Sequence, residues 1–200
     1  MLNIIDPMRY PKDQKEKTRR FVVETASRLL RRDGIEGVKI VPLMKEAGMT
    51  QGAFYKNFES RDELVVEAIL HAAVQTRSLA MQWAAAGRDG AGGAVANIID
   101  EYLSERHLDP REGGCPLAAL GSELWRQPDA IRRAVFRAFK ETVEVISLEL
   151  PADRREMAWS LYMFLASVLQ SARIAVTRKE QLSIMAEGRR TARMLFGAAT

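Results

Sequence analysis

The sequence predicts an all-α protein with two domains, a small one over residues 1–60 and a larger helical one over residues 61–200. Apolar residues recur at helical spacing through most of the chain, which is the main sequence signal of amphipathic helices. Glycines and prolines cluster between these periodic segments and divide them into separate helices. With 200 residues, 47% of them apolar and 28% charged, the chain can bury a substantial core.

The first helix is expected from Asp13 to Arg32, and Gly34 stops it. Its apolar side consists of residues at helical spacing, namely Phe21, Val22, Thr25, Ala26, Leu29 and Leu30. Residues 1–12 contain two prolines and no helical period. We therefore expect them to form a loose arm.

Two short helices joined by a tight turn are expected next. The first covers residues 41–47, with Pro42 near the first helical position, where its missing N–H is no loss. Gly48 is the residue best able to adopt the left-handed backbone that ends a helix. Thr50 is a suitable N-cap for the second helix, residues 51–58.

The second short helix has an apolar ridge and a separate polar face. At about 100° per residue, Phe54 and Phe58 fall on one side, where they can pack inward. The exposed side offers an amide, a bare backbone position, a phenol and an ammonium, on Gln51, Gly52, Tyr55 and Lys56. Such a helix suits the major groove of DNA, which admits a single helix. We expect a DNA-binding helix-turn-helix, and the alternative is two packed helices with a solvated polar face.

A long helix from Arg61 to about Ala86 follows. Ser60 and Glu63 have the spacing of a capping box at its start. Because this helix leaves the first domain and enters the second, we expect it to link the two mechanically.

The run from Ala47 to Leu64, which reads AGMTQGAFYKNFESRDEL, resembles the N-terminal domain of tetracycline-repressor-like (TetR-family) transcription regulators. That pattern runs alanine-glycine-valine-serine, a variable residue, glycine-threonine-leucine-tyrosine, two variable residues, phenylalanine, then serine-lysine-glutamate and leucine. The match is specific and covers about the first third of the chain. The remainder resembles the family only in length and helical layout.

The resemblance and the exposed face together define candidate DNA-binding residues. Gln51 can pair with adenine and Lys56 can donate to guanine. The positions that mostly fix the phosphates in this family correspond to Thr50, Ala53, Tyr55, Asn57 and Arg61.

Two departures from the family pattern precede this run. Val38 and Lys39 stand where the family usually has two hydroxyl residues. Lys39 either supplies a phosphate contact in their place or is a solvated lysine. Leu43 and Met44 replace the usual isoleucine-alanine pair and indicate altered packing.

The net charge of +4 lies entirely in the N-terminal segment. Residues 1–62 hold 13 Lys and Arg against 9 Asp and Glu, and the remaining residues hold equal numbers of each sign. An excess of positive charge in that segment favours binding of a polyanion. Arg9, Lys12 and Lys15 either contact phosphates or the minor groove, or belong to an arm that is simply disordered.

The second domain is expected to contain five further helices, at residues 94–103, 115–125, 131–150, 157–176 and 180–196. His107 to Gly114 is expected to be a polar loop. The helix at 157–176 has apolar residues on every side and therefore needs cover on every side. The last two helices look like the pair through which TetR-like proteins form homodimers.

The expected function is that of a dimeric repressor, which binds a palindromic double-stranded DNA operator and responds to a small apolar effector. For each candidate effector-binding residue the alternative is ordinary core packing; the candidates are Trp83, Tyr102, Cys115, Leu120, Trp125, Phe136, Phe139, Tyr162 and Phe164. Cys115 at a helix start also raises a second hypothesis, a repressor that senses oxidants or electrophiles through its thiol. A buried cysteine that acts as a small hydrophobe is the alternative.

The sequence shows no glycine-rich phosphate loop, nucleophile elbow, metal cluster or paired histidine and carboxylate. We therefore expect no metal, no cofactor and no enzyme, with a helical enzyme lacking a recognisable motif as a remote alternative. A single cysteine excludes an intramolecular disulfide and fits a reducing compartment. No apolar run reaches membrane-spanning length, and Asp6, Pro7 and Arg9 stand where a signal peptide needs an apolar core. We expect a cytoplasmic protein that does not contact membranes.

Overall fold

The computed structural model describes residues 9–90 and 92–197, with side chains from residue 14 onward, and this part of the chain contains helices and no strand. The helices are α1 (Arg9–Asp33), α2 (Ile40–Glu46), α3 (Gln51–Asn57), α4 (Arg61–Gly87), α5 (Gly93–Tyr102), α6 (Glu105–Leu108), η1 (Arg111–Gly113), α7 (Pro116–Leu124), α8 (Asp129–Glu149), η2 (Ala152–Met157), α9 (Ala158–Ile174) and α10 (Arg178–Phe196). The predicted all-α fold is confirmed. Within the described residues, no helix is long and apolar enough to cross a membrane.

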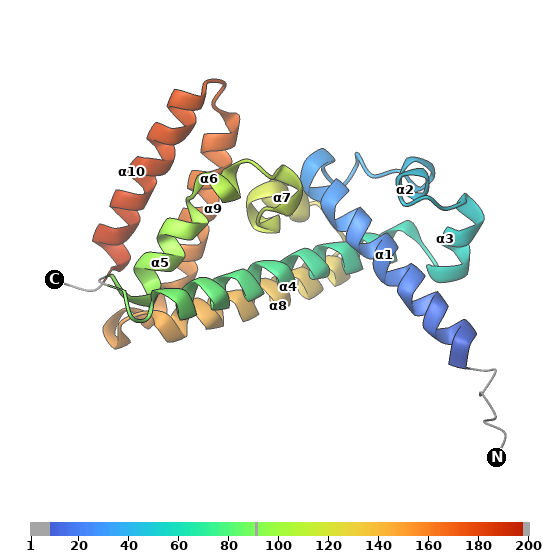
Figure 1. Cartoon of the computed structure of the whole chain (residues 1–200), viewed down its shortest axis with the longest axis horizontal. Helices are drawn as coiled ribbons and strands as arrows, with labels where there is room; N and C mark the ends of the chain where they lie inside the picture. The colour runs from blue at the N-terminus through green and yellow to red at the C-terminus, as the bar shows by residue number, and fades with distance from the viewer. Residues whose placement is uncertain (1–8, 91, 198–200) are drawn as a thin grey trace, which may run out of the picture.

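Helix α4 runs along the molecule and connects its two ends (Figure 1). At one end, α1, α2 and α3 surround the start of α4, and at the other end α5 packs on α4 while α9 and α10 stand as a pair. Helix α8 lies alongside α4, and α7 lies between α1 and α9. The helix predicted to link the two ends therefore has that position.

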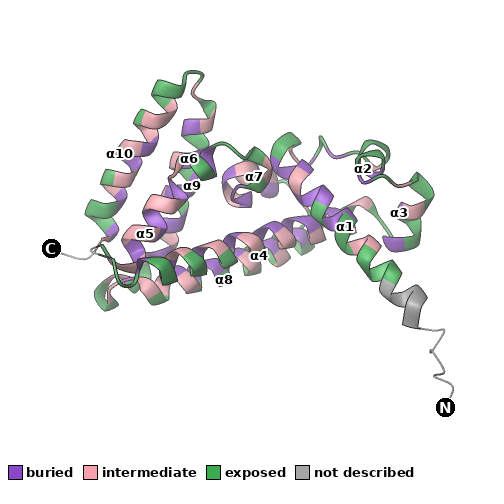
Figure 2. Cartoon of the chain, viewed as in Figure 1, coloured by how far each residue is buried: buried purple, intermediate pink, exposed green. Residues whose placement is uncertain are grey.

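Small buried side chains allow several helices to approach α4 closely. Ala68, Ala72, Ala73, Ala80 and Ala84 are all buried along it. Because α1, α5 and α8 pack on different sides of α4, its apolar residues are spread around it and do not form one stripe. In Figure 2 the buried residues follow the sides of α4, α5 and α9 that meet neighbouring helices.

The pair α9–α10 also depends on a small residue. A Cβ placed on Gly188 of α10 would lie 2.4 Å from Cγ1 of Val168 on α9, so only glycine permits this approach. Thr177 and Glu180 form a complete capping box at the start of α10. The close packing and the cap together fix the α9–α10 hairpin.

The prediction of a loose arm over residues 1–12 is wrong for residues 9–12, because α1 begins at Arg9. Pro11 is tolerated in the first helical turn, where the backbone N–H groups have no intrahelical acceptor. Residues 1–8 and the side chains of Arg9 and Lys12 lie outside the described part of the chain. Lys15 is exposed.

The segment expected to be a polar loop, residues 107–114, contains the end of α6 and all of η1. His107 and Leu108 are buried in it, because α6 packs against α5 and α9. The single turn of α6 is too short to give a recognisable period in the sequence.

Two predictions about burial are also wrong. Trp125, expected to point inward, is 64% exposed, because it follows the last turn of α7 as its C-cap. Helix α9 is not apolar on every side, since most of its exposed residues are polar; the exposed residues are Ser160, Met163, Ser167, Gln170, Ser171 and Ile174.

Candidate nucleic-acid interface

The turn between α2 and α3 has the predicted glycine geometry. Gly48 has φ of 68°, and its N–H donates to the carbonyl of Lys45 at 3.0 Å. The N–H of Met49 donates to the carbonyl of Met44 at 2.7 Å. These two bonds make a Schellman motif, which satisfies the last carbonyls of α2 and directs the chain into α3.

Packing of two phenylalanines sets the orientation of α3. Phe54 and Phe58 are 0% and 2% exposed, and their stacked rings lie 5.4 Å apart. The opposite side of α3 is exposed, as predicted, at Gln51, Gly52 and Lys56. Tyr55 is 61% exposed, although burial would favour its large ring. The helix therefore presents one bare face with donors and acceptors above a packed ridge.

Three further predicted contact residues belong to α3 or to the N-cap positions of α2 and α3. Thr50 occupies the N-cap position of α3, but its hydroxyl makes no hydrogen bond to the helix and is exposed. Lys39 occupies the corresponding position before α2 and is also exposed. Ala53 is half-buried between the face and the packed ridge. The starts of α2 and α3 thus carry an exposed ammonium and an exposed hydroxyl, neither of which caps its helix.

The side chain of Asn57, predicted to fix a phosphate, is turned into the domain. It is 9% exposed, and its Nδ2 donates to the carbonyl of Ala53 at 2.7 Å. Its Oδ1 is buried without a hydrogen-bond partner among the described residues. A buried amide of this kind closes the end of α3 and is poorly placed to reach a phosphate.

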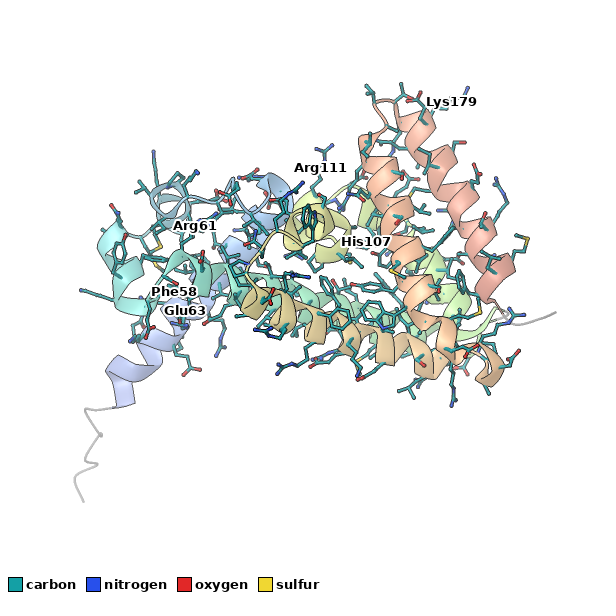
Figure 3. The ribbon with its side chains drawn as sticks, turned by 180° about the vertical axis from the view of Figure 1, so that it is seen from behind. Phe58, Arg61, Glu63, His107, Arg111 and Lys179 are labelled. Carbon is teal, nitrogen blue, oxygen red and sulfur yellow. The ribbon has the colours of Figure 1, made fainter. Side chains whose placement is uncertain are left out.

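Arg61 is likewise occupied within the domain. Its Nε donates to the carbonyl of Val38 at 3.0 Å, and a second guanidinium nitrogen donates to the carbonyl of Ile35. Arg61 therefore holds the loop between α1 and α2, which the sequence pattern alone does not reveal. Figure 3 shows Arg61 close to Phe58 and Glu63, where α3 meets α4.

Arg19 of α1 is a structural residue of this surface that sequence reasoning missed. Its guanidinium bonds to the carboxylates of Glu63 and Glu67 on α4 and to the carbonyl of Asn57. It also lies 4.4 Å from the centre of the Phe58 ring. The hydrogen bond from Arg19 holds the pKa of Glu63 below its ordinary value. Arg19 is more than forty positions from Glu63 and Glu67 in the sequence. No motif in the sequence indicated that these residues pair.

The predicted effector residues fall into separate places in the second domain. Trp125, Phe136 and Phe139 line a groove of about 430 Å³ between α7 and α8. Leu120 is buried at 1% exposure in the core. Phe164 lies elsewhere, against Phe196 of α10, with the ring centres 6.3 Å apart.

The remaining predicted effector residues form a buried polar cluster around Cys115. The thiol of Cys115 lies 3.1 Å from the hydroxyl of Tyr162, and both residues are 0% exposed. The hydroxyl of Tyr102 is buried there without a hydrogen-bond partner among the described residues. Trp83 is half-buried and packs edge-on against Tyr102, with ring centres 6.3 Å apart. Burial raises the pKa of both tyrosines well above its ordinary value.

His107 joins this cluster as a neutral imidazole. Its Nε2 accepts from the backbone N–H of Cys115 at 3.2 Å, so its Nδ1 carries the proton and donates to the carbonyl of Tyr102 at 2.7 Å. Burial lowers the pKa of His107 to about 4. This histidine is a second residue that the sequence did not reveal as structurally important.

Two arginines border the cluster, Arg31, which is buried, and Arg173, which is half-buried. Arg31 of α1 donates to the carbonyl of Gly114 at 3.2 Å and to Oε1 of Gln75 at 3.0 Å. Arg173 of α9 donates to the carbonyl of His107 at 2.9 Å. Burial lowers the pKa of Arg31 to about 10, so it stays charged at neutral pH. Arg31 connects α1 directly to the start of α7.

The packed three-helix end and the bare face of α3 form a helix-turn-helix, the arrangement of a class of DNA-binding domains. Residues 22–68 match the family of bacterial regulatory proteins, tetR family. An uncharacterized HTH-type transcriptional regulator of Haemophilus influenzae is 35% identical over 92 residues, which cover 45% of this chain and 44% of that protein. The chain thus spans less than half the length of this curated relative.

Solved structures share the whole fold. The reduced form of NemR from E. coli has a TM-score of 0.75 at 16% identity, covering 92% of this chain and 99% of that one. A TetR transcriptional regulator from Chloroflexus aurantiacus has a TM-score of 0.69 at 21% identity, covering 94% and 100%. The chain therefore resembles TetR-family regulators: residues 22–68 match the family model, and the fold of the chain is similar to that of these solved structures.

Proposed function

We propose that the protein is a repressor that binds a palindromic DNA operator as a homodimer and leaves it when a small effector binds the second domain. The observation that carries the proposal is the bare face of α3, with Gln51, Tyr55 and Lys56 exposed above the buried ridge of Phe54 and Phe58. Gln51 and Lys56 read base edges, and Lys39 and Thr50 contact phosphates.

The α9–α10 pair supports the proposed homodimer. Met163 and Ile174 on α9 and Met194 and Leu195 on α10 are between 43% and 76% exposed. A shallow groove of about 400 Å³ runs between the two helices and includes half-buried Phe164. A second copy related by a two-fold axis covers such a surface with the same surface of its own.

The two recognition helices of the dimer then lie on one side, spaced for successive major grooves. An effector releases the operator only if it binds one spacing of these helices better than the other.

Selection of bound sequences from random duplex DNA tests the proposal. We expect an enriched palindrome with two half-sites about one helical turn apart. Enrichment of a single, asymmetric site by a protein that sediments as a monomer would contradict the dimer, and no enrichment at all would contradict DNA binding.

A charge on the exposed side of α9 tests the interface separately. Met163→Glu buries an unpaired charge in the proposed interface, so it should sediment as a monomer and lose operator affinity. Met81→Glu, at a methionine of α4 that is similarly exposed, is the matched control and should remain dimeric. Equal sedimentation of both variants as dimers would place the interface elsewhere.

The thiol hypothesis remains the alternative to a pocket. The cluster of Tyr102 and Tyr162 around Cys115 places polar groups at the thiol, but the thiol is 0% exposed. Under the pocket proposal, Cys115→Ser still releases DNA when the effector is added. Under the thiol alternative, a peroxide or electrophile releases wild type from DNA and leaves Cys115→Ser bound.

A further inference from the structure

The groove between α7 and α8 has aromatic walls that are largely exposed, and the guanidinium of Arg126 lies 4.6 Å from the centre of the Trp125 ring. Trp125 is 64% exposed and Phe136 is 60% exposed, although both are large side chains that burial would stabilise. The Phe136 ring is held in place by stacking on Trp159, with ring centres 5.3 Å apart and an interplanar angle of 7°. The fixed ring of Phe136 and the exposed ring of Trp125, both on the walls of one groove, suit a planar aromatic ligand.

The rim of this groove carries an excess of positive charge. Arg132 and Arg133 share the single carboxylate of Asp129, at 3.1 Å and 3.6 Å. Both arginines and the aspartate line the groove. One carboxylate neutralises only one guanidinium, so the rim retains one positive charge, and a guanidinium pairs well with a carboxylate.

One part of the groove wall lacks a side chain. Gly121 of α7 lines the groove, and a Cβ built there would meet only Cδ1 of Leu117, at the ordinary contact distance of 3.6 Å. The groove volume of about 430 Å³ lies within the usual range for small-molecule sites. A methyl group at position 121 would enter this space at ordinary contact distance, and a longer side chain would extend from there.

We propose that the groove between α7 and α8 binds a planar aromatic carboxylate, with its rings between Trp125 and Phe136 and its anionic group at Arg132 and Arg133. This inference rests on the proposed function, because it identifies the ligand as the effector of that regulator. The proposed ligand therefore has the apolar body expected of the effector and, in addition, a single negative charge.

Contacts at both ends of α7 explain how a ligand there reaches the DNA-binding end of the protein. Just before α7, the carbonyl of Gly114 accepts from Arg31 of α1 at 3.2 Å. Near its end, Oε2 of Glu123 accepts from the backbone N–H of Ile35, directly after α1, at 2.8 Å. The carbonyl of Ile35 in turn accepts from Arg61. A ligand that separates α7 from α8 therefore displaces the loop that precedes α2.

Calorimetric titration of the full chain, without DNA, tests the site. The probes are 2-naphthoate and its neutral counterpart 2-naphthylmethanol. We expect the acid to bind at least tenfold more tightly than the alcohol, and the double variant Arg132→Gln/Arg133→Gln to abolish this preference. Gly121→Leu should weaken binding of the acid at least tenfold, whereas Gly121→Ala, the matched control, should stay within a few-fold of wild type.

Equal binding of acid and alcohol, or no binding of either at millimolar concentration, would overturn the proposal. So would unchanged binding by Gly121→Leu. Release of a selected operator is then measured with the same probes. If naphthoate binds wild type but not Gly121→Leu, the site is established even if no operator can be selected. Failure of the regulator proposal is therefore distinguishable from failure of the site.

Discussion

Replacement of Arg61 distinguishes a phosphate contact from a structural role. The sequence resemblance assigns Arg61 to the DNA phosphates, but the structure shows it bonded to the carbonyls of Val38 and Ile35. Each hydrogen bond from a charged donor contributes about 1.5–3 kcal/mol. Arg61 is half-buried, so water replaces part of this loss, and we expect Arg61→Ala to lower the free energy of unfolding by about 2–4 kcal/mol.

Two measurements on the same variant decide between the roles. Urea unfolding reports the loss of stability, and operator titration at several salt concentrations reports the number of phosphate contacts. We expect Arg61→Ala to be destabilised while its salt slope stays that of wild type. Lys39→Ala is the matched control, since Lys39 is exposed at the start of α2, and it should reduce the slope by about one without loss of stability. Unchanged stability with a reduced slope for Arg61→Ala would refute this reasoning.

Three further predictions follow from named contacts. Glu123→Gln should bind naphthoate as wild type does but release the operator at higher ligand concentration, because the charged bond to Ile35 is weakened; equal release would contradict coupling through α7. The pKa of His107 is near 4, below its ordinary value, so the free energy of unfolding should fall by roughly 3 kcal/mol as pH drops from about 6.5 to below 4, and this slope should flatten in His107→Gln. Gly188→Ala places a Cβ 2.4 Å from Val168, and a destabilisation of about 1–3 kcal/mol with weaker dimerisation is expected in unfolding and sedimentation experiments.

The helix-turn-helix was predictable from sequence because its determinants are local. Gly48, the N-cap position of Thr50 and the spacing of Phe54 and Phe58 each act within one or two helical turns. A wheel drawn from the sequence therefore identified the exposed side of α3, at Gln51 and the residues that share its face.

The occupied side chains near α3 were not predictable, because their partners are distant in sequence. Arg61 bonds to a loop 23 to 26 residues earlier in the sequence, and Arg19 bonds to Glu63 and Glu67, which lie 44 and 48 residues later. A resemblance to a family shows which residue types match. It does not show which polar side chains form hydrogen bonds within the folded protein.

In the second domain, the periodicity of the sequence predicted the positions of the longer helices. It did not always predict which side chains are buried. Trp125 has the spacing of an inward residue, yet it lies where α7 ends and the chain turns. His107 lies in a single turn that has no period, and only the packing of α6 against α9 buries it. Periodicity describes one helix at a time, whereas burial depends on which helices meet.

The central claim, that the exposed face of α3 reads the operator, is tested most directly by repeating the selection of bound duplexes with Lys56→Ala. Lys56 is exposed, and it has no hydrogen bond or ion pair with the described residues. We predict a palindrome of unchanged spacing in which one position of each half-site loses its base preference, by about 1–3 kcal/mol of discrimination. A Lys56→Ala protein that selects the same motif as wild type at every position would contradict the assignment of this face to the DNA.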